Sequence, residues 1–369
     1  ARAAVGAVVE YDGPEGHAFE ELLVDAGDGA VLARIPRVYH ALNRSIYNLS
    51  GGCIQLNAQL PGTLLLKDGT MMMTNDKDAN QVRDAFGNVY WWYYYMMNRD
   101  SLDDAGFELK ATVHVQFPSG LSCSPNNAAW LGDPYNQMVY GDGDGKLLTN
   151  LAAGFDVTAH EMTHGVTAKT SNLTYRNESG ALNEANSDII GAAAEAWVNS
   201  GGGANGSPAT ITANANTWKI GEDVAGPMLP WSGGALRFMN NPTADQSSRD
   251  FYADRYSGTQ DNGGVHWNSG IGNLAFYLVS EGGKHPRAAR AGATVKGVGI
   301  AKAGKIFERA NIYLFTASTN FQMARYATAQ AAQDLYGRCT PEWVAYHTAW
   351  DAVGVSGTWA RCPRTPSGF

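Results

Sequence analysis

The 369-residue sequence has few charged side chains and no long apolar run. Only 17% of its residues are Asp, Glu, Lys or Arg, so Asn, Ser, Thr, Gly and Tyr must supply much of the surface polarity. No run of about 18 apolar residues occurs, so we expect no membrane span and no membrane partner. The net charge is −8, and no basic stripe could neutralise several phosphates, which makes a nucleic-acid partner unexpected.

Cysteine is also scarce, with four residues and no CxxC pair. The missing CxxC weakens both a redox role and a zinc-ribbon interpretation. Four cysteines allow three pairings. We favour Cys53–Cys123 and Cys339–Cys362, because each pair joins the nearer segments, and four free buried thiols are the alternative.

The apolar content of 44% is enough for a large core, and the length suggests two domains or one elaborated domain. Residues 1–40 alternate like a small β unit, and 41–155 are rich in strand and turn patterns. Within that half, 78–97 has the pattern of a helix that ends in a run of aromatic residues and methionines. We interpret this run as core packing rather than as a carbohydrate or cofactor platform.

From residue 156 onward the pattern is helical. Ala-rich segments predict helices, at 156–170, 181–199, 265–282, 294–314 and 318–336. Strands are expected before this point, at 53–60, 63–66, 70–74 and 111–117. The fold class is therefore α+β, with a β-rich N-terminal half, a helical C-terminal half and the chemistry at their junction. Residues 199–216 are expected to form a surface loop.

A metal-binding pattern lies at that junction, at His160-Glu161-Met162-Thr163-His164. On a helix, positions i and i+4 share a face, so His160 and His164 can bind one metal ion. Glu161 can then act as a general base on a water at the metal. Two surface histidines on a helix are the simpler alternative, since HExxH also occurs by chance.

A second acidic group strengthens the pattern. Glu184 follows His164 by twenty residues, at the expected start of a helix, with Asp188 one turn later. Two His and one Glu leave the fourth zinc position open for water, which is typical of a catalytic site. Asp188 could accept the free ring N–H of a zinc-bound histidine, or it could simply favour the positive end of the helix.

The segment 156–189, DVTAHEMTHGVTAKTSNLTYRNESGALNEANSDI, resembles the active-site signature of the thermolysin family of zinc metalloproteases. Thermolysin is known for zinc ligands of two His and one Glu, so the resemblance implies that His160, His164 and Glu184 are the zinc ligands. Other HExxH families fit less well: metzincins need a histidine where Thr170 stands, and aminopeptidases place the glutamate one residue closer. The resemblance covers about residue 40 to the C-terminus. It implies a two-lobed fold with the active site between a β-rich lobe (37–155) and a helical lobe (156–369).

The segment 261–270, DNGGVHWNSG, is similar to the second signature of the family. The resemblance implies that His266 stabilises the oxyanion of the tetrahedral intermediate and that Asp261 orients this histidine. Tyr175 matches the tyrosine that faces the same oxyanion. The alternatives are ordinary roles, namely a loop histidine and a packing tyrosine.

Several substrate-binding positions are implied in the same way. Arg237 matches the arginine that binds the substrate carbonyl on the primed side, and Asn127, Ala128 and Trp130 match the edge strand that binds the substrate backbone. Six aliphatic residues match the wall of the S1′ pocket: Leu148, Leu151, Val157, Ile220, Val224 and Leu236. This pocket implies cleavage before Leu, Phe, Ile or Val, with broad preference because a missing methylene costs only about 1–3 kcal/mol.

The resemblance also implies calcium. Three carboxylates match family ligands: Asp156, Glu195 and Glu222. Thr217 and Lys219 stand where an Asp and a Glu are expected, and Gly234 where an outer site expects an Asp, so we predict one Ca²⁺ rather than several. We interpret 141–145, GDGDG, as a tight turn, because it lacks the glutamate spacing of an EF-hand.

Residues 1–36 resemble the last strands of a propeptide that folds and inhibits these proteases, although a hairpin of the mature protein is the alternative. The resemblance as a whole implies a secreted, monomeric zinc endopeptidase whose partners are protein and peptide substrates and its own propeptide. The two competing hypotheses are a zinc protein that binds peptides without cleaving them, and an exopeptidase.

Overall fold

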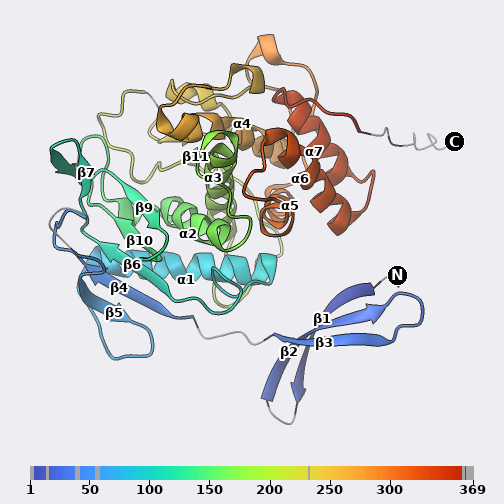
Figure 1. Cartoon of the computed structure of the whole chain (residues 1–369), viewed down its shortest axis with the longest axis horizontal. Helices are drawn as coiled ribbons and strands as arrows, with labels where there is room; N and C mark the ends of the chain where they lie inside the picture. Colours follow the sequence, from blue (N-terminus) through green and yellow to red (C-terminus); the bar gives the residue numbers. More distant parts are fainter. Residues whose placement is uncertain are drawn as a thin grey trace.

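The structure is a computed structural model, and it describes residues 4–13, 16–37, 42–54, 59–231, 233–359 and 362. Figure 1 shows a β-rich part and a helical part on either side of the central helices α2 and α3. The family resemblance predicts this two-lobed α+β arrangement, and it is confirmed.

The N-terminal segment forms a sheet of its own. Its three antiparallel strands are consecutive in sequence: β1 (Ala4–Gly13), β2 (Gly16–Asp25) and β3 (Val31–Arg37). Figure 1 draws this sheet apart from the larger one. The small β unit predicted over residues 1–40 is therefore present within its described residues.

The β-rich part is built on a five-stranded sheet of order β5-β4-β6-β10-β9. Its strands are β4 (Arg44–Asn48), β5 (Thr63–Lys67), β6 (Leu109–Val113), β9 (Ala128–Leu131) and β10 (Gln137–Tyr140). A hairpin of β7 (Phe117–Ser119) and β8 (Ser122–Ser124) and a pair of β11 (Lys219–Ile220) and β12 (Arg237–Phe238) complete the strands. Strand β9 pairs only with β10 and is an edge of the sheet.

Helix α1 (Lys77–Met97) packs on this sheet. Asp76 caps it by accepting hydrogen bonds from two backbone N–H groups of the first turn, and Asn98 ends it in the left-handed conformation. Tyr90, Trp92 and Tyr93 of the aromatic run are buried and Tyr95 is exposed, so most of the run is core packing, as predicted.

The remaining helices form the helical part: α2 (Phe155–Lys169), α3 (Asn177–Asn199), α4 (Asp261–Glu281), α5 (Ile300–Tyr313), α6 (Phe321–Tyr336) and α7 (Pro341–Ala352). Short 3₁₀ turns lie between the main elements: Leu151–Ala153, Pro242–Asp245, Tyr252–Asp254 and Ala288–Arg290. The predicted helices were wrong in extent at several ends: residues 294–299 and 318–320 are not helical, and α3 begins at Asn177 rather than at residue 181. The periodicity also did not predict α7.

Helices α2 and α3 are the buried centre of the molecule, and small residues let them approach closely. A Cβ atom on Gly191 of α3 would lie 3.1 Å from the carbonyl oxygen of Asp156 on α2. Both helices are buried along most of their length, so their relative position is fixed by packing rather than by solvent-exposed contacts. This close pair carries the candidate metal ligands.

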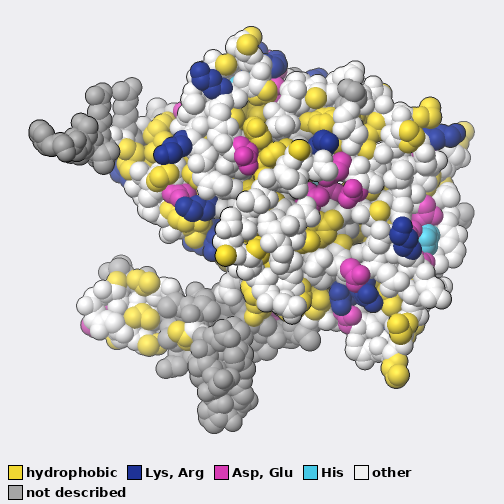
Figure 2. Space-filling view, turned by 180° about the vertical axis from the view of Figure 1, so that it is seen from behind, with side chains coloured by type: hydrophobic (Ala, Val, Ile, Leu, Met, Phe, Trp, Pro, Cys, Tyr) yellow, Lys and Arg dark blue, Asp and Glu magenta, His cyan; other side chains and the backbone are white. Residues whose placement is uncertain are grey.

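Both favoured disulfides are present, Cys53–Cys123 and Cys339–Cys362, and the alternative of four free thiols was wrong. Among the described residues, no helix is long and apolar enough to cross a bilayer. On the face drawn in Figure 2, Lys and Arg side chains lie in small groups among apolar and uncharged ones. This face is thus as poor in charge as the composition indicates.

Candidate active site

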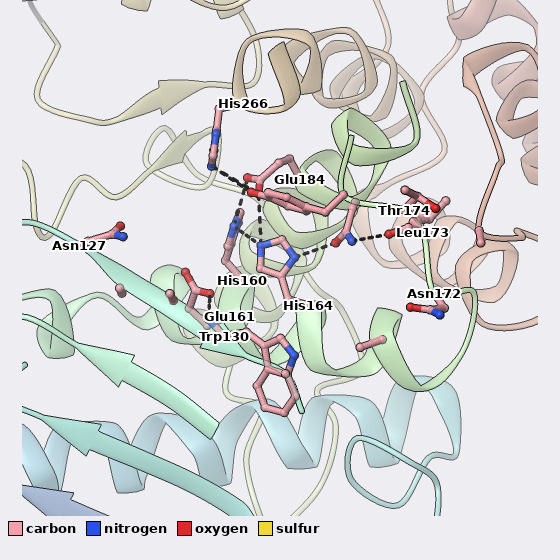
Figure 3. A pocket seen from close by; sticks show the side chains of 17 residues that line it. Asn127, Trp130, His160, Glu161, His164, Asn172, Leu173, Thr174, Glu184 and His266 are labelled. Carbon is pink, nitrogen blue, oxygen red and sulfur yellow. Dashed lines mark hydrogen bonds and ion pairs between the residues drawn. The ribbon is translucent and has the colours of Figure 1, made fainter. Parts of the chain in front are cut away.

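Two histidines and a glutamate converge where α2 meets α3 (Figure 3). His160 and His164 lie one turn apart on α2, and their Nε2 atoms are 3.0 Å apart. Glu184 reaches them from α3: its Oε2 lies 3.4 Å from Nε2 of His160, and its Oε1 lies 3.4 Å from Nε2 of His164. Glu184 lies two turns into α3, because that helix begins at Asn177, earlier than the sequence pattern suggests.

The other ring nitrogens determine the tautomers. Nδ1 of His160 lies 2.8 Å from a carboxylate oxygen of Asp188, which can only accept, so this nitrogen carries the proton. Nδ1 of His164 lies 2.7 Å from Oδ1 of Asn183 and 3.1 Å from Oγ of Ser187. In the neutral rings both Nε2 atoms are then bare acceptors that face each other, an arrangement that a cation between them, either a proton or a metal ion, stabilises.

The charge balance of the cluster supports the same conclusion. Oε2 of Glu184 is buried and has no hydrogen-bond partner. Burial lowers the pKa of His160, but hydrogen bonds to Asp188 and Glu184 outweigh it and raise this pKa to about 10. The site therefore attracts positive charge, and Zn²⁺ fits this set of two imidazoles and one carboxylate.

Glu161 lies beside this cluster and is tied to the edge strand. Its Oε2 accepts a hydrogen bond of 2.6 Å from the backbone N–H of Trp130 in β9. The same carboxylate lines both cavities that meet at the ligands. Glu161 is thus oriented by the sheet edge on which a substrate backbone could add as another strand.

Helix α4 supplies a second histidine-carboxylate pair. Nδ1 of His266 lies 2.6 Å from Oδ1 of Asp261, whose other oxygen accepts the backbone N–H of His266. The chain from Asp261 to Gly264 is left-handed throughout, and a Cβ on Gly263 would lie 2.1 Å from Oδ1 of Asn177. This turn folds the aspartate back beneath the imidazole.

His266 and Tyr175 face the metal ligands from the open side. The Tyr175 hydroxyl donates to Glu184 and lies 3.3 Å from Nε2 of His266. Burial lowers the pKa of His266, but the carboxylates of Glu184 and Asp261 outweigh it and raise this pKa. The Tyr175 hydroxyl and Nε2 of His266 thus lie close together beside the metal ligands.

Arg237 extends the network behind His160. Its Nε and Nη2 donate to the two oxygens of Asp188 at 2.8 and 2.6 Å, and Asn273 donates to the same carboxylate at 2.7 Å. Burial raises the pKa of Asp188, but the Arg237 guanidinium and the His160 hydrogen bond outweigh it and hold this pKa well below its usual range. Asp188 is thus charged and accepts the Nδ1–H of His160, which is the first of the two roles predicted for it.

Two cavities meet at the ligands. The smaller one, about 110 Å³, is lined by five of the predicted pocket residues: Leu148, Leu151, Val157, Ile220 and Leu236. Val224, the sixth, is not a lining residue. It is fully buried, and a Cβ on Gly154 would touch both Val224 and Val157. The larger cavity, about 590 Å³, lies along Asn127, Ala128 and Trp130.

The predicted calcium carboxylates share one acidic neighbourhood. Asp156 already accepts backbone N–H groups of Val157 and Gly221. Glu195 and Glu222 each keep a buried Oε2 without a partner, and burial with nearby Asp156 raises their pKa values to about 7 and about 8. Such uncompensated oxygens suit a cation. The ligand atoms are nevertheless not drawn together as closely as those of His160, His164 and Glu184.

Among the described residues, one other group has metal-ligand spacing, Asp78, His114 and Asp142. His114 lies 2.9 Å from Asp76 through Nε2 and 2.8 Å from Asp142 through Nδ1. Both ring nitrogens thus already have carboxylate partners, as in an imidazolium. The 141–145 segment is a turn, in which Asp144 accepts the N–H groups of Lys146 and Leu147.

Sequence reasoning missed the residues that hold the ligands from behind: Asn183, Ser187 and Asn273. Asn183 and Ser187 lie near Glu184 on α3, so the sequence could have indicated that they are on the helix face that meets the histidines. Asp223, which adds negative charge beside Glu195 and Glu222, was also missed.

Comparison with known proteins agrees with this geometry. The family model described as thermolysin metallopeptidase, catalytic domain, matches residues 36–168, and the one described as its alpha-helical domain matches 171–355. The chain belongs to the thermolysin family of metallopeptidases. Membership of the thermolysin family implies zinc at the catalytic centre, and calcium is known among its members.

Individual relatives of the thermolysin family support this assignment. The chain is 44% identical over 298 residues to bacillolysin of Bacillus cereus, covering 80% of this chain and 47% of that protein. It is 43% identical over 297 residues to thermolysin of Alicyclobacillus acidocaldarius, covering 80% and 49%. The chain thus spans about half the length of these curated relatives. The precursor of protealysin, a metalloproteinase from Serratia proteamaculans, has a TM-score of 0.67 and 27% identity, covering 86% of this chain and 89% of that one.

Proposed function

We propose that this chain is a secreted zinc endopeptidase that cleaves peptide bonds before bulky hydrophobic residues. The observation that carries the proposal is the pair of Nε2 atoms of His160 and His164, 3.0 Å apart beside Glu184, with Glu161 next to them. A cation site bordered by a further carboxylate and an open cavity suits a hydrolytic centre.

The metal would be held by His160, His164 and Glu184. When bound, zinc supplies Lewis-acid polarisation of the scissile carbonyl and a more acidic attacking water. Structural zinc sites are more often closed by four Cys or His ligands, whereas this set leaves a position for substrate or water. The Nδ1–H bonds to Asp188 and Asn183 keep both rings oriented.

The proton transfers fall to Glu161. Its carboxylate accepts the proton of the attacking water and passes it to the leaving amine. The Trp130 N–H bond of 2.6 Å holds this carboxylate in place while one oxygen stays free. General-base catalysis of this kind needs a positioned carboxylate within hydrogen-bond reach of the water, and Glu161 meets the positional requirement.

His266 and Tyr175 stabilise the developing oxyanion by donating hydrogen bonds to it. Asp261 keeps Nδ1 of His266 protonated and oriented, at 2.6 Å. Arg237 binds a substrate carbonyl through Nη1, because Nε and Nη2 are occupied by Asp188. Asn127 and Ala128 bind the substrate backbone beside the edge strand β9.

The smaller cavity sets the proposed preference. Its aliphatic lining and volume of about 110 Å³ suit one Leu, Ile, Val or Phe side chain on the primed side. Leu148, Ile220 and Leu236 would supply apolar contact, while Arg237 at its border orients the backbone. Selectivity among these side chains should be modest.

Two further assignments belong to the same proposal. Asp156, Glu195 and Glu222 would bind one structural Ca²⁺, which the unpartnered oxygens of the two glutamates support. Residues 1–36 would be a propeptide-like segment, a proposal supported by their separate sheet and by the likeness to a precursor of protealysin. We further propose that the enzyme is a monomer.

A peptide blocked at both ends, with Gly-Leu at the scissile bond, tests the proposed function. At neutral pH with calcium, we expect cleavage before Leu, loss of activity with a zinc chelator and recovery with zinc. The blocked ends exclude an exopeptidase, which needs a free terminus. If one zinc per chain is bound but no cleavage occurs even after limited proteolysis of residues 1–36, the chain is a peptide-binding protein and the proposal is wrong.

A further inference from the structure

A buried carboxyl group lies beneath the metal ligands and belongs to none of the roles above. Glu308, on α5, is 0% exposed. Its Oε1 accepts the hydroxyl of Tyr93 on α1 at 3.2 Å, and its Oε2 accepts the amide of Asn186 on α3 at 2.9 Å. A buried carboxyl is costly unless hydrogen-bonded, and here the donors come from different helices.

One branch of this network reaches the histidine helix. The Tyr93 hydroxyl lies 3.0 Å from Oγ1 of Thr163, the residue immediately before His164. Thr163 donates its proton to the carbonyl of Ala159, the residue immediately before His160, so it can only accept from Tyr93. The one proton of the Tyr93 hydroxyl is therefore shared between Thr163 and Glu308, and Tyr93 contacts both Glu308 and the turn of α2 that carries both histidines.

The other branch reaches the glutamate helix. Asn186 lies two residues after Glu184 and two before Asp188, and its side chain is fully buried. A third donor, Asn311, bonds Glu308 at 3.4 Å and Oγ1 of Thr167 on α2 at 3.2 Å. Glu308 thus joins α1, α2, α3 and α5 at one point below the site.

We propose that Glu308 is a positioning residue that fixes the spacing of α2 and α3 and thereby the zinc affinity of His160, His164 and Glu184. The inference rests on the proposed zinc site. The three ligands come from two helices, and their nitrogen and oxygen atoms meet within 3.4 Å. A shift of one helix against the other changes both histidine–glutamate separations, because packed cores move as units rather than deform locally.

Directional hydrogen bonds suit this role better than apolar contacts. Aliphatic side chains permit small sliding of one helix on another, whereas Glu308 requires Tyr93 and Asn186 at defined positions. Burial raises the pKa of Glu308 to about 7, although the hydrogen bond from Asn186 lowers it. A carboxyl group buried in the core at this cost is consistent with a need to define the relative position of the helices rather than to add stability.

Zinc affinity of the full chain, measured by competition with a chromophoric chelator, tests the inference. Glu308→Leu removes every acceptor and should weaken zinc binding by about tenfold, the lower end of the range for groups that orient metal ligands. Glu308→Gln should rescue the affinity to within about threefold, because its oxygen accepts from Asn186 and its amide donates to Tyr93. The Tyr93 hydroxyl can then donate to Thr163.

Tyr93→Phe keeps the test decisive if Glu308→Leu does not fold, since it deletes one buried oxygen only. Tyr346→Phe is the matched control: the Tyr346 side chain is buried too, but its hydroxyl donates to Ala303 on α5 at 2.6 Å rather than to a residue of either ligand helix. We expect Tyr93→Phe to weaken zinc binding several-fold and Tyr346→Phe to leave it unchanged. The absorption spectrum of the Co²⁺-loaded protein should change in Tyr93→Phe and stay the same in Tyr346→Phe.

The outcomes separate this inference from the proposed function. If the wild type binds no zinc, or if His160→Ala leaves zinc bound, the proposed site is wrong and the inference falls with it. If zinc binds at that site but Tyr93→Phe and Tyr346→Phe have equal affinities, the site stands and the positioning role of Glu308 is overturned.

Discussion

The carboxylate of Glu161 accepts a hydrogen bond of 2.6 Å from the backbone N–H of Trp130. This bond joins the helix that carries the proposed zinc ligands to the edge strand that would bind substrate. The group that transfers the proton and the strand that positions the peptide are therefore fixed to each other.

Glu161→Gln should abolish turnover while zinc stays bound. The amide oxygen can still accept the Trp130 N–H, so the local geometry is kept and only proton transfer is lost. General-base catalysis contributes on the order of 10²–10⁴ in rate, so we expect a fall in kcat of at least about a hundredfold. Activity on the blocked peptide and zinc content measure the two effects. A variant with more than a few per cent of wild-type activity would contradict the assigned base.

Leu236→Ala should shift the preference on the primed side toward larger residues. Leu236 lines the smaller cavity and is only partly buried, so its truncation enlarges the pocket without removing a core residue. The ratio of kcat/KM for Phe over Leu should rise by about tenfold, the lower end of what pocket size supplies. Val224→Ala is the control, because Val224 is buried behind the wall and should alter stability only. Equal ratios in Leu236→Ala and the wild type would exclude this cavity as the specificity pocket.

Calcium should raise the unfolding temperature through Glu222 and its neighbours. At calcium one hundred times Kd, ligand binding adds about 2.7 kcal/mol of stability, a rise on the order of 5 °C in a chain of this size. Glu222→Gln should remove most of this rise. Asp144→Asn, which weakens the 141–145 turn, should lower the unfolding temperature equally with and without calcium. Scanning calorimetry measures both, and a full calcium response in Glu222→Gln would locate the ion elsewhere.

The motif of the site could be predicted from sequence because its parts are local. His160 and His164 share a helical face by spacing alone, Glu184 follows at the start of the next expected helix, and the family resemblance adds His266 and Arg237. The structure brings these five residues together. Their catalytic roles remain predictions.

Residues that act through tertiary packing could not be found in this way. Asn273 reaches Asp188 only because α4 packs on α3, and nothing in its local sequence marks it. Glu308 resembles any charged residue of an amphipathic helix until the fold places it under the site.

The elements of the fold that were wrongly predicted or missed have similar causes. Residues 70–74 have the composition of a strand, but Met71 and Met73 are almost fully exposed and the segment is irregular. Helix α7 was missed although Thr340 and Pro341 give it a proper N-cap and first residue. Strand β4 (Arg44–Asn48) was missed because Ile46 and Tyr47 are its only apolar residues, so it has neither alternation nor an apolar run, and its pairing with β5 and β6 places it in the sheet.

The pH dependence of stability offers a test of the His114 cluster. Burial lowers the pKa of His114, but hydrogen bonds to Asp76 and Asp142 outweigh it and raise this pKa above its usual 6.5. A raised folded-state pKa means that the stabilising contribution is complete below about pH 6.5. It is lost as pH rises through the folded-state value. His114→Gln should therefore lower the free energy of unfolding at pH 5.5 by about 1 kcal/mol, allowing for partial exposure.

At pH 9 the same variant should differ less from the wild type.

His347 should change the stability in the opposite direction with pH, since burial and Arg325 lower its pKa to about 4. Its neutral ring favours folding at neutral pH, and that contribution declines as pH falls from about 6.5 toward 4. His347→Gln should thus flatten the acid side of the stability curve, while His114→Gln flattens the alkaline side. Denaturant titrations between pH 5 and 9 measure both slopes. An effect of His114→Gln that stayed constant over this range would show that the ring is not held as an imidazolium between the two aspartates.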